Sequence, residues 1–158
     1  MASRLWARSS VSWHGVACCF AIAGLVCPSP VVALEFRSVA APAAVLYDAP
    51  SLQGRKVAVL NHGYPVEIVV TLGAWLKVRD ATGELAWIEA GRLSNERMVM
   101  LRVPRAPVRN APEDSAPVVF QAELGLLLEL IDTLDNWAHV KHRDGLTGYI
   151  RITELWGI

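Results

Sequence analysis

The segment PVEIVVTLGAWLKVRDATGELAWIEAGRLS (residues 65–94) carries the clearest indication of the fold of this chain. Its first part, residues 66–72, is rich in β-branched residues. Its middle, residues 75–79, alternates between apolar and polar side chains, and Gly83 then precedes a further apolar run at 85–88. β-branched runs and strict alternation, separated by turn glycines, are typical of short strands joined by hairpins. The segment therefore predicts an all-β structure.

The same order of residues occurs a second time, 62 positions later. Between Pro42 and Leu93, 14 of 52 positions carry the residue that stands 62 positions further on, and these are mainly turn residues and apolar residues. Trp75 thus corresponds to Trp137, and Gly83 to Gly145. Self-similarity at a fixed offset indicates a duplicated structural unit. We predict two domains, residues 35–96 and 97–158.

Each unit is predicted to be a small barrel or sandwich. Five or six short strands in 62 residues, with no convincing helix, are typical of these folds. Residues 121–134 could form an amphipathic helix by composition, but the matching residues 59–72 contain Gly63-Tyr64-Pro65 and a β-branched run, which argues against it. The joint at 95–97 is short, so we expect the two barrels to pack together or nearly touch.

The sequence also predicts how each barrel closes. The apolar run Met98–Leu101 aligns with Phe36–Val39 at the offset of 62. We therefore expect each unit to open with its own leading strand, residues 35–39 in the first barrel and 97–101 in the second. In the rival arrangement, residues 98–101 complete the first barrel and leave the second with an unpaired edge, which favours association.

The first 33 residues have the order of a secretory signal peptide. Arg4 and Arg8 are followed by an uncharged apolar run at 15–26, and small residues at Val31 and Ala33 suit cleavage after Ala33. Two alternatives are an uncleaved membrane anchor and a lipoprotein. Prolines at 28 and 30 end the apolar run early for a membrane span, and none of the three cysteines follows a leucine-small-small pattern. We expect a periplasmic or secreted protein, with no stable membrane anchor after cleavage.

Composition excludes several classes of protein. The chain has 15 basic and 15 acidic residues, so no net charge attracts nucleic acid or an anionic membrane. A hydrophobic content of 53% with 19% charged residues excludes general disorder. Cleavage after Ala33 would remove all three cysteines, and with them any disulfide, thiolate metal site or cysteine nucleophile.

The residues suited to catalysis or metal binding are scattered. None of His62, His139 and His142 occupies the same position in both units. Glu67 and Glu129 are shared, but single acids on separate barrels make no acid–base pair unless the barrels meet there. We therefore predict no catalytic residue, no metal site and no cofactor.

A binding surface is easier to recognise. If Leu76 and Val78 face the core, alternate residues of the same strand face outward, and a three-residue hairpin loop ending in Gly83 or Gly145 brings the next aromatic to the same face. The alternative is that the tryptophans only cap a small barrel that lacks core volume. The candidate ligand-binding residues are Trp75, Lys77, Arg79, Trp87, Trp137, His139, Lys141 and Tyr149.

The quoted segment and its counterpart DNWAHVKHRDGLTGYIRITELWGI (residues 135–158) resemble the bacterial SH3-like (SH3b) domain family, in particular exported proteins built from two such domains. The resemblance implies tandem SH3-like β-barrels and a binding role at the cell envelope. The partner would be peptidoglycan, with protein–protein interaction or scaffolding in the periplasm as the alternative. Likeness to eukaryotic SH3 domains ends at Arg151, which stands where their peptide groove has a proline. We expect a monomer.

Overall fold

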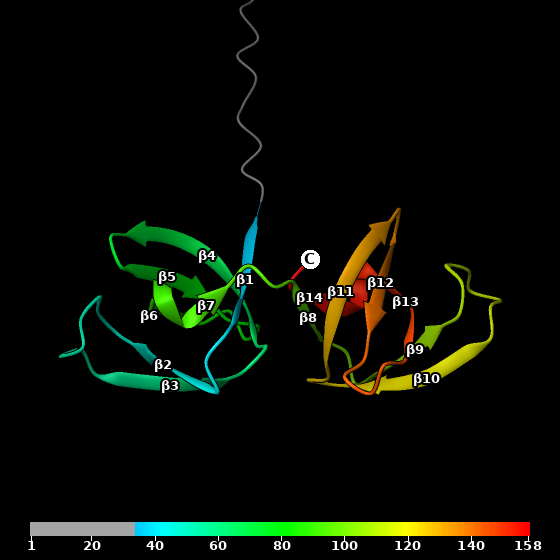
Figure 1. Ribbon diagram of the computed structural model, residues 1–158, viewed down its shortest axis with the longest axis horizontal. Helices are drawn as coiled ribbons and strands as arrows, with labels where there is room; N and C mark the ends of the chain where they lie inside the picture. Colours follow the sequence, from blue (N-terminus) through cyan, green and yellow to red (C-terminus); the bar gives the residue numbers. More distant parts are fainter. Residues whose placement is uncertain (1–33) are drawn as a thin grey trace, which may run out of the picture. The chain divides into compact units, whose positions relative to one another are not determined.

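A computed structural model describes residues 34–158, and the predicted signal peptide lies outside these residues. The first barrel is a seven-stranded antiparallel sheet with the order β3-β2-β6-β5-β4-β1-β7 (Figure 1). A 3₁₀ turn at Ala90–Arg92 precedes its last strand. Its strands are β1 (Glu35–Val39), β2 (Ala43–Tyr47), β3 (Lys56–Asn61), β4 (Pro65–Leu72), β5 (Trp75–Arg79), β6 (Leu85–Glu89) and β7 (Leu93–Ser94).

The second barrel repeats this topology strand for strand, in the order β10-β9-β13-β12-β11-β8-β14. The tandem all-β architecture is therefore confirmed, and residues 121–134 form the end of one strand, a turn and the next strand, not a helix. A 3₁₀ turn at Ile152–Glu154 precedes the last strand here too. The strands are β8 (Met98–Leu101), β9 (Arg105–Arg109), β10 (Val118–Glu123), β11 (Leu127–Leu134), β12 (Trp137–Lys141), β13 (Thr147–Arg151) and β14 (Leu155–Trp156).

Each barrel closes with its own leading strand. Strand β1 pairs with β4 on one side and with β7 on the other, with Phe36 opposite Glu67 and Val39 opposite Leu93. Strand β8 pairs in the same way with β11 and β14 of the second barrel. The prediction of a leading strand in each unit is confirmed, and the rival arrangement is wrong.

The two cores consist of aliphatic and alanine side chains. In β5, β6, β9 and β13, buried residues alternate with more exposed ones, as the period of two requires. The two sets of buried side chains that form the core clusters are Val39, Ala44, Leu46, Leu60, Val66, Leu76, Val78, Ala86 and Ile88 in the first barrel, and Val99, Leu101, Ala106, Val108, Ala122, Leu128, Ala138, Val140, Ile150 and Leu155 in the second.

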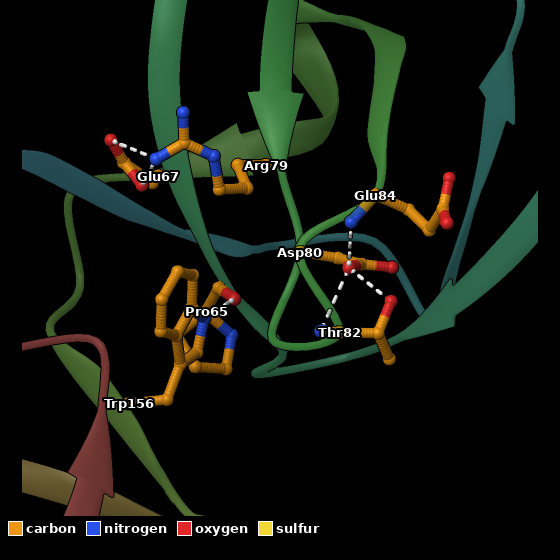
Figure 2. A network of polar contacts seen from close by, with 7 residues as sticks. All are labelled: Pro65, Glu67, Arg79, Asp80, Thr82, Glu84 and Trp156. Atoms are coloured by element: carbon orange, nitrogen blue, oxygen red, sulfur yellow. Dashed lines mark hydrogen bonds and ion pairs between the residues drawn. The ribbon is translucent and has the colours of Figure 1, made fainter.

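The hairpin after the central strand has the predicted form in both barrels. Three residues separate Asp80 from Glu84, and the last of them, Gly83, has φ +91°. Asp80 Oδ1 accepts hydrogen bonds from the N–H groups of Thr82 and Glu84 at 2.9 and 3.0 Å (Figure 2). In the second barrel Gly145 has φ +88°, and His142 Nδ1 accepts the N–H of Asp144 at 3.2 Å. His142 therefore has the turn-forming role of Asp80.

The last strand of the second barrel contacts the first barrel. The Trp156 indole Nε1 donates a hydrogen bond to the carbonyl oxygen of Pro65 at 3.0 Å (Figure 2). Its ring meets Phe36 edge to face, with centroids 5.2 Å apart. The Ser38 hydroxyl also accepts the N–H of Met98 at 3.1 Å. The expectation that the barrels pack together is confirmed.

Replacing Trp156 with Ala is expected to lower the free energy of unfolding by about 2 kcal/mol, because a half-buried aromatic ring and its hydrogen bond are both lost. Trp156→Phe keeps the ring contact with Phe36 and should cost about 1 kcal/mol, the usual worth of one hydrogen bond. Urea unfolding followed by circular dichroism measures both. A Trp156→Ala protein as stable as the wild type would contradict the importance of this contact.

Candidate functional site

The outer face of β5 and β6 carries the candidate residues of the first barrel. Along β5, Leu76 and Val78 are buried, and the alternating residues Trp75, Lys77 and Arg79 are partly exposed, as predicted. In the register of β5 and β6, Lys77 lies opposite Trp87. Directly opposed residues share a face. Trp87 is therefore on the same face as Trp75, which confirms the prediction from the hairpin.

The aromatic rings of this face contact a residue that sequence reasoning missed. Tyr47 on β2 lies opposite Trp87 in the sheet, and its ring meets Trp75 edge to face at a centroid distance of 5.5 Å. Lys77 Nζ lies 5.9 Å from the centre of the Trp87 ring. The alternation of β2, with Leu46 buried inward, could have placed Tyr47 on this face.

Two exposed aliphatic residues extend the face beyond the tryptophans. Val70 lies opposite Lys77 and Leu72 opposite Trp75, so both share the outer face. Their exposed fractions are 45% and 55%. Sequence analysis did not include them because they lie past a register shift between Ile68 and Val70, which the sequence does not reveal. We call Val70, Leu72, Trp75, Lys77 and Trp87 the first-barrel face.

The matching face of the second barrel differs from the prediction. Tyr149 does share a face with Trp137, but Trp137 is buried, with an exposed fraction of 6%. Trp137 does point away from the core, as predicted, since Ala138 and Val140 are the inward residues of its strand. Its ring is nevertheless not exposed, because the Arg151 guanidinium lies over it, 4.1 Å from the ring centre. His139 stacks on Tyr149 with ring centroids 4.6 Å apart. Both aromatic rings of this face are thus in contact with neighbouring side chains of the same barrel.

The two outermost candidate cations are held in ion pairs within each barrel. Arg79 donates to both carboxylate oxygens of Glu67, at 2.9 and 3.2 Å (Figure 2). Lys141 Nζ lies 3.1 Å from Glu129. These contacts explain why Glu67 and Glu129 recur at matching positions. They also engage two of the candidate ligand-binding residues, Arg79 and Lys141, with carboxylates of their own barrels.

Four of the cavities on the described residues have volumes between about 290 and 520 Å³. Lys141 is the one candidate residue that lines any of these four, in a cavity of about 290 Å³ that also contains His62 and Glu96. The largest of the four, about 520 Å³, is lined in part by Leu126, whose counterpart in the first barrel is Tyr64.

Within residues 34–158, no cluster of three or more His, Cys, Asp or Glu could hold a metal ion. No helix in that range is long and apolar enough to span a membrane.

Two groups outside the candidate face have raised pKa values. Burial raises the pKa of the Glu154 carboxyl, and hydrogen bonding and charge from Arg151 offset part of this rise. Because folding raises the pKa of this acid, its contribution to stability is present at low pH and is lost as pH rises through the folded pKa. Burial likewise raises the pKa of the Tyr64 hydroxyl, which accepts a hydrogen bond from the Ala81 N–H at 3.3 Å. Neither group touches the first-barrel face.

The order of strands, the two hairpins and the outer aromatic residues recur in both units, and the comparison with known families agrees with this duplication. The family model described as bacterial SH3 domain matches residues 40–95 and again residues 102–157. The chain belongs to the bacterial SH3 domain family. The first-barrel face is thus the outer surface of the first SH3 domain. No curated protein matches the chain.

Three solved structures resemble the tandem SH3 chain at low sequence identity. NlpC2 from Trichomonas vaginalis is 21% identical over 78% of this chain and 48% of its own, with a TM-score of 0.37. NlpC1 from the same organism is 19% identical over 81% and 47%, with a TM-score of 0.37. An NlpC/P60 family protein from Bacillus cereus is 15% identical over 77% and 56%, with a TM-score of 0.36. The chain spans about half the length of these proteins.

Removing the cation from each ion pair should affect the two SH3 domains differently. Arg79→Met leaves the Glu67 carboxylate, whose side chain is only 9% exposed, without its partner. We expect a loss of about 2–3 kcal/mol in the free energy of unfolding. Lys141→Met is the matched control, because the Glu129 side chain is 45% exposed, and it should cost less than about 1 kcal/mol. Equal losses in urea unfolding would contradict this account.

Proposed function

We propose that the protein is a non-catalytic binding module of the bacterial cell envelope that recognises peptidoglycan through the first-barrel face. The observation that carries the proposal is the gathering of two tryptophans and two exposed aliphatic residues on one side of one barrel. Contiguous exposed apolar surface marks interaction sites in soluble proteins. Bacterial SH3 domains are commonly cell-wall binding modules, which supports the envelope as the setting.

The chemistry of the face suits a glycan that carries peptides. Indole rings offer flat apolar surfaces on which the apolar side of a sugar ring can stack, together with a polar N–H. Lys77, close to Trp87, has no salt bridge within 4.0 Å in the described part of the chain and supplies an ammonium group for a stem-peptide carboxylate. The proposal assigns stacking to Trp75 and Trp87 and charge recognition to Lys77.

A second candidate function is protein–protein interaction or scaffolding in the periplasm. Val70 and Leu72 favour it, because exposed aliphatic residues beside aromatic ones are also common at the centres of protein interfaces. The two functions differ in what the face binds. Peptidoglycan stripped of protein should retain the chain under the first proposal and not under the second.

Retention of the protein on purified sacculi stripped of protein distinguishes peptidoglycan binding from protein–protein interaction. Trp75→Ala and Trp87→Ala should each weaken binding by about tenfold, the effect of losing one aromatic anchor worth 1–2 kcal/mol. Tyr149→Ala, at the position of the second barrel that matches Trp87, is the control and should leave binding within about twofold, since it removes no anchor. A wild-type protein that is not retained would favour the protein-partner alternative.

The proposed location is the periplasm or the exterior of the cell, and it depends on residues 1–33 acting as a cleaved signal peptide. Intact-mass measurement on protein purified from the envelope fraction should give a chain that begins near Leu34. A chain that retains Met1, or one that carries acyl groups on Cys27, would overturn the proposed export route.

A further inference from the structure

The two barrels share a scaffold but place different residues around the corresponding tryptophans. In β5 and β6, Trp75 lies opposite Glu89, whereas in β12 and β13 Trp137 lies opposite Arg151. Opposed residues on one face are within contact distance of each other. The residue that can reach the indole is therefore an anion in the first barrel and a cation in the second.

In the second barrel this cation covers the indole. The Arg151 guanidinium carbon lies 4.1 Å from the centre of the Trp137 ring, well inside the range of a cation–π contact. Arg151 Nη2 also lies 2.6 Å from Asp114 Oδ2. The position that matches Asp114 in the first barrel is Leu52, which is 62% exposed. The contact over Trp137 thus depends on Arg151 and Asp114, and the first barrel has neither residue at the matching positions.

A second arginine holds the loop that carries Asp114. Arg109 Nη1 donates to the carbonyl oxygen of Ala116 at 2.7 Å, which ties residues 110–117 to the end of β9. The residue that matches Arg109 in the first barrel is Tyr47, which packs edge to face on Trp75. At this shared position, Tyr47 adds an aromatic ring to the outer face of the first barrel, whereas Arg109 holds the 110–117 loop beside the outer face of the second barrel.

We infer that Arg151, held by Asp114, closes the aromatic face of the second barrel, so that the first barrel alone binds the envelope ligand. This inference rests on the proposed function for the identity of the ligand. A ligand that needs the Trp137 ring must first displace a cation already bound there, which lowers its apparent affinity. Arg151 is thus the specificity-determining residue that separates the roles of the two copies.

Solvent exposure of each indole tests the closure without any ligand. In ¹⁵N-labelled protein, a soluble gadolinium chelate broadens indole N–H signals according to their exposure. Arg151→Ala and Asp114→Asn should raise the broadening of the Trp137 signal by about twofold or more, since the cation over the ring is removed or released. Glu89→Ala is the matched control and should leave Trp75 unchanged. Unchanged broadening of Trp137 in both variants would overturn the inference.

Two variants are used because Arg151→Ala also removes the aliphatic stem that packs on the ring, whereas Asp114→Asn keeps it. Thermal unfolding of each variant shows whether it is folded at the temperature of the measurement. If Arg151→Ala unfolds, Asp114→Asn decides the matter, because Asp114 is exposed and its amide replacement disturbs only the ion pair.

The second measurement asks which copy binds. Soluble muropeptides released from sacculi are titrated into the labelled wild-type protein, and the four indole signals of the described residues are followed. Shifts of Trp75 and Trp87 without a shift of Trp137 are expected. A shift of Trp137 equal to that of Trp75 would overturn the inference. If no indole shifts, the proposed function fails, and the broadening of Trp137 still decides whether Arg151 closes the face.

Discussion

Each barrel closes around a core of nine or ten small aliphatic side chains, and the other features of the molecule depend on this narrow interior. A sheet wrapped around so little volume admits Val, Leu, Ile and Ala but leaves the tryptophans outside. Because strand residues alternate between the two faces, the larger rings collect on the outer side of the central strands. The candidate binding surface is therefore a consequence of how small the barrel is.

Duplication then produced two outer faces on one scaffold. Residues that set the interior and the turns recur at the offset of 62, such as Val78 with Val140 and Gly83 with Gly145. Residues on the outside have changed their chemistry, as Glu89 and Arg151 show. An outward side chain makes few packing contacts, so its replacement costs little stability and can alter what the surface binds. Trp75 of the first copy is partly exposed, whereas Trp137 of the second copy is covered by Arg151.

The contact between the barrels adds a constraint that neither copy contains alone. Trp156 belongs to the last strand of the second barrel, yet its indole bonds to Pro65 and packs on Phe36 of the first. The leading strand of the first barrel is thus packed on one side by the end of the chain. Such a contact between residues far apart in sequence links the stability of the two units.

Hydrophobic periodicity and turn glycines are local signals, so the fold class, the duplication, the leading strands and the inward side of the central strands could be predicted from the sequence. It also placed Trp75 and Trp87 on one face. The closed barrel was needed to show that Trp137 is buried, that Arg79 is engaged by Glu67, and that Val70 and Leu72 belong to the first-barrel face. Those features depend on a register shift within β4 and on residues such as Asp114, 37 positions from Arg151, meeting across the barrel. Local sequence patterns carry no information about such long-range contacts, because the closure of the sheet determines which distant loops and strands come together.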